Sequence, residues 1–506
     1  MTLVEKHFKK TAKLVRAIDK KVIAEWLLTE GYFPEQYVLP PSFSVTDFKL
    51  KTKPYNKNLN DPARRKLVTI SYPKSLLTSR VFGIQHPFNY HDIVFHLIED
   101  WKIVVDHIFH NDLKIFSYSF PIPVNAKAIG KLGNLRSGRM IYEWVEMAEK
   151  DMVAEAHKYN FIIRADITNF YNSVYTHSIG WALHGREKAF ADKEFKLTGN
   201  KVDKLIQYAN DARTNGIPVG SALSDLIAEI VLTSIDRKVS SKLKTINFVG
   251  SRFKDDYRIL CNSEDEAKKI LKVLSDELVE FNLLINEHKT KVLTLPDGLY
   301  RQHDREYHNY SLKDKEAIPF KTFELTLLKA LDIHKAYPGT SILEKFFSEL
   351  YDNDSKLKIQ FSADNNARNK QILKAMSLLM LVKRESEKTL CHVLAICEEI
   401  YIKYRSPKLK EKLKYLIESE IVKASNKKSA FELVWLVFFS RYLSLGLTTF
   451  SKMIDKELME TAFLKSVISS EQKFFNDSKQ KLFLKPKDCK TKTLSKRLAV
   501  FDRNKE

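Results

Sequence analysis

The stretch NFVGSRFKDDYRILCNS, residues 247–263, constrains the fold more than any other part of the chain. Residues 248–253 are typical of a β-strand, and residues 257–261 alternate apolar side chains onto one face of a second strand. Asp255 and Asp256 fall between them, at or beside a hairpin turn. Because adjacent carboxylates repel, this pair either faces water in an ordinary turn or meets a strongly positive partner.

A third acid favours the positive partner. The run FIIRAD predicts a strand over 161–166 that ends at Asp166, although an Asp in this place is usually a helix cap or turn residue. If this strand lies beside the hairpin, three carboxylates form an oxygen-rich site that suits Mg²⁺. Two such ions, about 3.5–4 Å apart, activate an attacking hydroxyl and stabilise a leaving pyrophosphate.

The neighbouring segments complete a small sheet backed by helices. The loop GIPVG, residues 216–220, leads into a helix that we expect Ser221 to cap. The sequence SEDE at 263–266 is a capping-box pattern that begins a second helix. Residues 281–293 then predict a return strand with a basic turn at Lys289.

Changes in the pattern of apolar and polar residues along the chain predict three regions. Residues 1–65 begin helical and then turn irregular, 66–305 mix strands with helices, and 306–506 follow helical spacing that is typical of a solenoid or bundle. The tail from Lys473 to Glu506 holds eleven Lys or Arg against four Asp or Glu. It either wraps a polyanion, stays partly disordered, or keeps the chain soluble.

Charge and cysteine usage narrow the class of protein. A net charge of +21 predicts attraction to a polyanion, either nucleic acid or an acidic membrane surface. Four scattered cysteines without a CxxC pair predict a reducing, cytoplasmic compartment; Cys391 and Cys397 are expected in the core. The apolar run at 430–447 contains Glu432 and Arg441, which favours a buried helix and no membrane span.

In this order, the elements over about 66–305 resemble the palm of a reverse transcriptase. The segments NFYNSVYTHSIGWALHG and GIPVGSALSDLIAEI resemble the phage abortive-infection polymerases, the AbiK family. The resemblance implies an α+β fold of fingers and palm followed by an all-α C-terminal domain. It also implies an antiphage enzyme of the bacterial cytoplasm, a homo-oligomer that makes DNA from dNTPs without a template and with a protein tyrosine as primer.

The resemblance assigns catalytic roles by position. Asp166, Asp255 and Asp256 would bind two Mg²⁺ ions, with Mn²⁺ as the alternative ion, and the Ile167 carbonyl would assist. Lys289 would protonate the pyrophosphate as a general acid; a solvated turn lysine is the alternative.

The resemblance also implies a nucleotide pocket. Tyr171 would lie against the sugar and exclude a 2′-hydroxyl, unless it is a core aromatic. Gly220 would let the nucleotide approach the backbone, although any loop-to-helix junction looks similar. Lys74 and Arg80 would grip the triphosphate, with a solvated surface strand as the alternative.

Two positions depart from the family pattern. Val219 stands where glutamine is usual and cannot hydrogen-bond as glutamine would, which favours untemplated synthesis. Phe253 replaces the usual tyrosine and keeps its ring. Tyr32, Tyr37 and Tyr55 are candidate priming residues, and ordinary packing is the alternative for each. Two rival functions remain: an RNA-templated reverse transcriptase with a partner RNA, and an inert nucleic-acid-binding scaffold.

Overall fold

The computed structural model describes residues 1–74, 78–133, 145–469 and 474–498. The chain divides into two compact units. Unit 1 contains Met1–Pro34, Val45–Val68 and Gly83–Tyr300, and unit 2 contains Glu35–Ser44, Thr69–Phe82 and Arg301–Glu506. The last stretch of unit 2 begins at Arg301, and residues 1–65, which the sequence predicts as one region, are divided between the two units.

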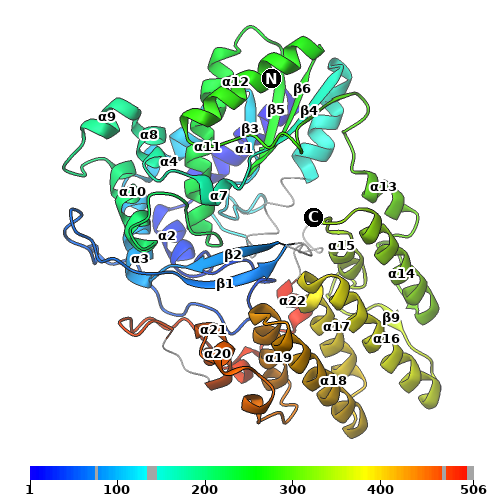
Figure 1. Ribbon diagram of the computed structural model, residues 1–506. Helices are drawn as coiled ribbons and strands as arrows, with labels where there is room; N and C mark the ends of the chain where they lie inside the picture. Colours follow the sequence, from blue (N-terminus) through cyan, green and yellow to red (C-terminus); the bar gives the residue numbers. More distant parts are fainter. Residues whose placement is uncertain (75–77, 134–144, 470–473, 499–506) are drawn as a thin grey trace. The chain divides into compact units, whose positions relative to one another are not determined.

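A five-stranded sheet forms the centre of unit 1 (Figure 1). Its spatial order is β3-β5-β6-β4-β7, with bounds Ile115–Ser117, Val249–Phe253, Asp256–Cys261, Phe161–Asp166 and Lys291–Thr294. β5 and β6 form the predicted antiparallel hairpin, and β4 pairs antiparallel with both β6 and β7. The strand β3, parallel to β5, was not predicted because three residues are too few to show alternation.

Helices surround this sheet within unit 1. The two longest are α11, Ala222–Lys242, and α12, Glu264–Glu280. Ser221 and Ser263 cap them as predicted, each side chain accepting a backbone N–H at 3.2 Å. The other helices of unit 1 are α1 Leu3–Arg16, α2 Lys20–Leu28, α3 Pro87–Glu99, α4 Trp101–Ile108, α6 Met152–Glu155, α7 Phe170–Ser173, α8 Ser178–His184, α9 Arg186–Ala191 and α10 Thr198–Ala209, with a π-helical turn at Val145–Asp151 and a 3₁₀ turn at Ala156–Lys158.

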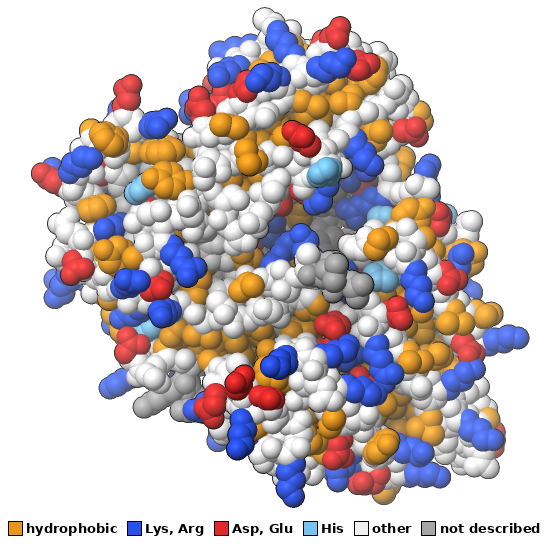
Figure 2. Space-filling view, viewed as in Figure 1, with side chains coloured by type: hydrophobic (Ala, Val, Ile, Leu, Met, Phe, Trp, Pro, Cys, Tyr) orange, Lys and Arg blue, Asp and Glu red, His pale blue; other side chains and the backbone are white. Residues whose placement is uncertain are grey.

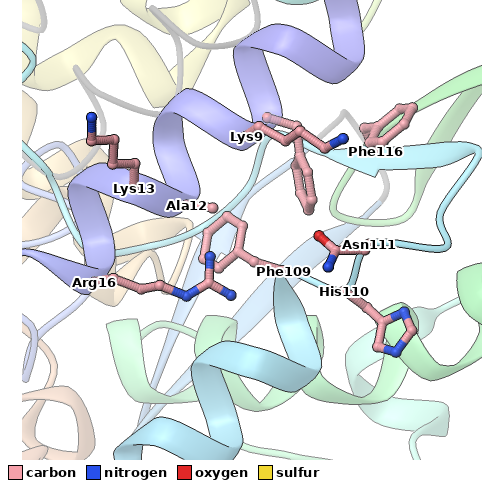
Figure 3. Close-up of a pocket in the computed structure, with 9 residues that line it drawn as sticks. Lys9, Ala12, Lys13, Arg16, Phe109, His110, Asn111 and Phe116 are labelled. Atoms are coloured by element: carbon pink, nitrogen blue, oxygen red, sulfur yellow. The ribbon is translucent and has the colours of Figure 1, made fainter. Parts of the chain in front are cut away.

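The N-terminal helix α1 belongs to unit 1 because its apolar stripe packs there. The ring of Phe8 lies 5.1 Å from that of Phe109 and 5.3 Å from that of Phe116, measured between centroids. A cavity of about 260 Å³ remains above these rings, with Lys9 and Arg16 among its lining residues (Figure 3). Burial of this apolar stripe explains why α1 is part of unit 1 and does not form a separate extension.

Unit 2 is mainly helical in the part that the structure describes. It also holds most of the two-stranded sheet of β1, Val68–Pro73, and β2, Ser79–Ile84, and a short parallel pair of β8, Ile318–Pro319, and β9, Ile359–Gln360. Its helices are α13 Gln302–His308, α14 Phe320–Ala336, α15 Ile342–Glu349, α16 Asn365–Glu385, α17 Leu390–Lys403, α18 Pro407–Asn426, α19 Ala430–Tyr442, α20 Lys456–Met459, α21 Ala462–Ser469 and α22 Leu494–Leu498, with 3₁₀ turns at Glu387–Thr389, Phe450–Lys452 and Pro486–Cys489.

Most of the apolar run at 430–447 forms α19, Ala430–Tyr442, a buried helix of unit 2. Its Glu432 is fully buried and accepts a hydrogen bond from the buried ammonium of Lys383. This ion pair explains how a charge fits within an otherwise apolar helix. Among the described residues, no helix combines the length and the hydropathy of a membrane span.

The basic tail is structured where the structure describes it. Leu482, Phe483 and Leu494 are buried within unit 2, so residues 474–498 are more than a solubilising tail; its remaining residues lie outside the described part. On the face shown in Figure 2, Lys and Arg side chains are spread among acidic and hydrophobic ones.

Candidate active site

The three predicted carboxylates come together at one end of the sheet in unit 1. Asp166 ends β4 and lies directly opposite Asp256 in the register of β4 with β6. Residues opposite each other in an antiparallel pair have Cα atoms about 5 Å apart. Asp255 is held at the same place, because its carbonyl accepts the backbone N–H of Ile167 at 3.2 Å.

The segment after α12 supplies the partners of Asp166. The carboxylate of Asp166 accepts hydrogen bonds from Lys289 Nζ at 3.0 Å and from Asn286 Nδ2 at 3.3 Å. The backbone N–H of Asn286 donates to the Asp166 carbonyl at 2.7 Å, which fixes this turn against the end of β4. The predicted basic turn therefore brings Lys289 to the acids, and sequence reasoning missed the amide of Asn286.

The proximity of the acids perturbs their protonation. Desolvation, followed by the negative charges of Asp255 and Asp166, raises the pKa of Asp256 to about 7. Asp256 keeps an exposed surface, and the repulsion from the two neighbouring carboxylates adds to the effect of desolvation. Desolvation lowers the pKa of Lys289, but its hydrogen bond to Asp166 and the charges of all three acids outweigh it, so the net shift is upward.

The donor chemistry of this cluster fits a hard divalent cation. Three carboxylates face one lysine, and the raised pKa of Asp256 reflects negative charge that a cation would relieve. Within the described ranges, no three His, Cys, Asp or Glu residues are grouped so that they could hold a metal ion, and Asp166 is paired with Lys289. Ion binding therefore requires side-chain rotation at this site.

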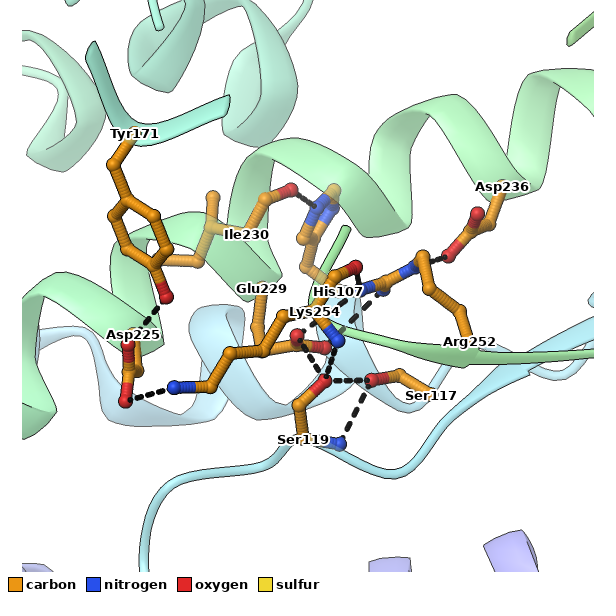
Figure 4. A network of polar contacts seen from close by, with 10 residues as sticks. All are labelled: His107, Ser117, Ser119, Tyr171, Asp225, Glu229, Ile230, Asp236, Arg252 and Lys254. Carbon is orange, nitrogen blue, oxygen red and sulfur yellow. Dashed lines mark hydrogen bonds and ion pairs between the residues drawn. The ribbon is translucent and has the colours of Figure 1, made fainter. Parts of the chain in front are cut away.

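A buried ionic network lies behind the hairpin (Figure 4). Arg252 on β5 is fully buried and donates through Nη1 and Nη2 to both oxygens of Glu229, at 3.0 and 3.2 Å. Its Nε donates to Asp236 at 2.7 Å. Burial raises the pKa of Asp236 to about 6, although the charge of Arg252 opposes that shift. The network anchors β5, one strand of the hairpin that carries the acid pair, to α11.

The predicted nucleotide-pocket residues near the acids occupy two adjoining segments. Tyr171 lies on α7, five residues after Asp166 in the sequence. Its carbonyl accepts the N–H of Ile217 at 2.8 Å. Gly216 has a φ of +86°, and a side chain there would crowd the Asn172 backbone, which explains the glycine. Gly220, with a φ of +129°, directly precedes Ser221, the cap of α11.

Lys74 and Arg80 lie outside unit 1. Lys74 follows β1, and its backbone N–H donates to the Thr78 carbonyl at 3.0 Å, while Arg80 lies on β2. Both belong to unit 2, so their predicted grip on the triphosphate stays a prediction.

The candidate priming tyrosines differ in accessibility. Tyr32 is buried and its hydroxyl donates to the Gln85 carbonyl, so ordinary packing, the alternative to priming, describes this residue. Tyr55 is half-buried, and its ring stacks on that of Phe88 at 4.0 Å. Tyr37 is half-buried in unit 2. The partners of Tyr32 and Tyr55 are distant in the sequence, so the local residue pattern could not predict these contacts.

The cysteines are buried and separate from this site. All four are free thiols. Desolvation raises the pKa of Cys261 to about 11 and that of Cys397 to about 12, and it also raises the pKa of Cys391.

Comparison with known proteins identifies the type of domain. Residues 111–328 match the family model of reverse transcriptases, described as RNA-dependent DNA polymerases. The chain is also 26% identical over 134 residues to the retron Se72 reverse transcriptase of Salmonella heidelberg (strain 579083-10). That alignment covers 26% of this chain and 33% of the relative, so the chain spans a third of the relative's length.

These matches show similarity to DNA polymerases of the reverse-transcriptase type within the matched part of the chain. The protein is reverse-transcriptase-like in residues 111–328, a range that contains all three acids but not Lys74 or Arg80.

Solved structures give distant likenesses. Apo telomerase from Candida tropicalis aligns at 11% identity and a TM-score of 0.33, over 76% of this chain and 71% of that one. Telomerase from Candida albicans, in complex with a TWJ fragment of telomeric RNA, aligns at 11% identity and a TM-score of 0.30, over 74% of this chain and 64% of that one.

Proposed function

We propose that this chain is an antiphage abortive-infection polymerase of the reverse-transcriptase type, which joins dNTPs into DNA by two-metal nucleotidyl transfer. The observation that carries the proposal is the position of Asp166 opposite Asp256 on neighbouring strands, with Asp255 beside them. Unopposed carboxylates repel, so a fold that brings three of them together needs a cationic partner. The AbiK-type sequence segments support the defence role and the DNA product.

Asp166, Asp255 and Asp256, with the Ile167 carbonyl, would hold Mg²⁺ or Mn²⁺. Bound there, the ions supply an activated hydroxyl nucleophile and stabilise the leaving pyrophosphate. The protein's own contribution is the fixed spacing of the backbone segments that carry these acids. The backbone bonds from Ile167 to Asp255 and from Asn286 to Asp166 hold that spacing before substrate arrives.

Lys289 is the proposed general acid. Its raised pKa keeps the ammonium protonated at neutral pH, so a proton is available for the leaving group. In the substrate-free protein this ammonium neutralises Asp166, and it must release the carboxylate before a cation binds there.

The nucleotide is proposed to bind between Tyr171 and the loop that ends at Gly220. The tyrosine ring would exclude a 2′-hydroxyl and so favour deoxynucleotides, and Gly220 lets substrate approach the backbone. Lys74 and Arg80 would hold the triphosphate. Val219 in place of glutamine supports synthesis without a template, and a tyrosine such as Tyr37 or Tyr55 would prime it within a homo-oligomer.

A second function is favoured by one observation. The similar curated protein is named a retron reverse transcriptase, so copying of a partner RNA is the alternative for this chain.

The deciding experiment supplies purified protein with each dNTP and Mg²⁺ but no template, followed by denaturing electrophoresis with and without protease. We expect DNA that migrates with the protein until protease releases it. Asp255→Asn should abolish incorporation without abolishing nucleic-acid binding. Product whose sequence follows a copurified RNA would establish the retron-like alternative, and binding without incorporation by the wild type would establish a scaffold.

A further inference from the structure

Lys254, the first of the two residues between β5 and β6, adopts an unusual backbone conformation. Lys254 has a φ of +53°, a region that residues with a side chain rarely enter. Its N–H donates to Ser119 Oγ at 2.7 Å, and its carbonyl accepts from Arg252 Nη1 at 3.1 Å. Its ammonium donates to Asp225 Oδ2 at 3.2 Å. Three separate contacts therefore hold the turn that leads directly into Asp255.

Asp225 links this turn to a second element. It lies in the first turn of α11, is 4% exposed, and its other oxygen, Oδ1, accepts the hydroxyl of Tyr171 at 2.5 Å. Figure 4 shows the single carboxylate between the phenol and the Lys254 ammonium. Hydrogen bonds to an ionised acceptor are stronger than neutral ones, and the helix N-terminus favours the negative charge.

Tyr171 is consequently fixed at both ends. Its backbone carbonyl accepts the N–H of Ile217, and its phenol reaches Asp225, so the ring has little freedom to tilt. A ring that selects the sugar must keep its position to within a fraction of an ångström, because small displacements admit the larger ribose.

We propose that Asp225 is a positioning residue that couples nucleotide selection to the catalytic hairpin. One carboxylate holds the ring of Tyr171 and the turn before Asp255, so the sugar-selecting surface and the metal-binding acids keep a fixed relation. The inference rests on the proposed polymerase function. It adds a residue whose role is selectivity and geometry, without contact to substrate.

Three variants separate the contact of Asp225 with Tyr171 from its contact with Lys254. Tyr171→Phe removes the phenol and should lower the preference for dNTP over rNTP severalfold, while the Mg²⁺ requirement stays unchanged. Lys254→Met removes the ammonium and should raise the Mg²⁺ concentration for half-maximal rate, while selectivity stays unchanged. Asp225→Asn removes the charge from the shared acceptor and should change both, with a loss of selectivity no larger than that of Tyr171→Phe, because the amide oxygen can still accept the phenol.

The double variant Asp225→Asn with Tyr171→Phe should lose no more selectivity than Tyr171→Phe alone, since without the phenol residue 225 has no hydroxyl to hold. Asp276→Asn, on the exposed side of α12, is the matched control and should change neither readout. Wild-type selectivity and Mg²⁺ dependence in Asp225→Asn would overturn the inference. If that variant does not fold, wild-type selectivity in Tyr171→Phe overturns it. A wild-type protein that incorporates no nucleotide overturns the proposed function instead.

Discussion

Replacing Asp256 by asparagine should stabilise the metal-free protein while it abolishes nucleotide incorporation. Asp256 lies opposite Asp166 and next to Asp255, and the pKa of its carboxyl is raised to about 7. Asparagine keeps the size of the side chain and removes the charge. The fold therefore loses a repulsion, whereas the proposed ion site loses a ligand.

The magnitude follows from Coulomb's law. Two unit charges about 5 Å apart repel by about 0.8 kcal/mol in water and about 3 kcal/mol at an effective dielectric constant of 20. Asp256 is exposed, so the lower end applies, and two neighbours together give about 1–2 kcal/mol after discounting for solvent screening. For a protein of this size that corresponds to a rise in Tm of about 1–2 °C.

The pH dependence makes the test specific. A native pKa of about 7 lies above the ordinary value of 3.8, so this group stabilises the fold at low pH and loses that contribution as pH rises through 7. The gain in Tm from Asp256→Asn should therefore be full at pH 8, smaller at pH 5 and absent below the ordinary value of 3.8, measured by calorimetry in EDTA. A lower Tm than wild type at pH 8, or an equal gain at pH 8 and pH 5, would refute the reasoning. Asp276→Asn should give no pH-dependent gain, because its partner is an exposed lysine.

Four further outcomes are expected. Arg252→Met should destabilise unit 1 by about 3–5 kcal/mol in denaturant unfolding, because it leaves buried acids unpaired, and adding Glu229→Gln should recover part of that loss. The Mg²⁺ concentration for half-maximal synthesis should fall as pH rises from 6 to 8, since protonated carboxylates bind no cation. Lys289→Met should slow incorporation about 10²-fold or more in single-turnover assays while nucleotide binding changes little; an unchanged rate would exclude the general-acid role. Cys391 and Cys397 should resist maleimide labelling until the chain unfolds, and rapid labelling in the folded state would contradict their burial.

The local elements of the site could be read from the sequence. The hairpin of β5 and β6, the strand that ends at Asp166, and the caps of α11 and α12 all have signals within a few residues. Alternation fixes which side chains share a face, and a cap fixes where a helix begins, so these predictions needed no long-range information.

Long-range pairing could not be read in the same way. The short strand β3 is too brief to alternate, and residues 69–82 join unit 2 although they precede most of unit 1 in the sequence. Tyr32 lies in an irregular segment and is nevertheless buried, because Tyr90 packs beside its ring at 4.7 Å. Such contacts depend on the fold as a whole and leave no periodic signal.

The acids of α11 show why the sequence did not reveal the residues that hold the hairpin in place. Asp225, Glu229 and Asp236 follow one another at spacings of four and seven residues, so they lie on one face of the helix. That pattern usually marks a solvated face, yet all three are buried against residues of the hairpin. The hairpin needs this support, because it carries two adjacent carboxylates and a left-handed lysine that would otherwise relax toward solvent. The acids that we propose to bind Mg²⁺ are therefore held in place by a second set of acids, which pair with Arg252 and Lys254 on the hairpin itself.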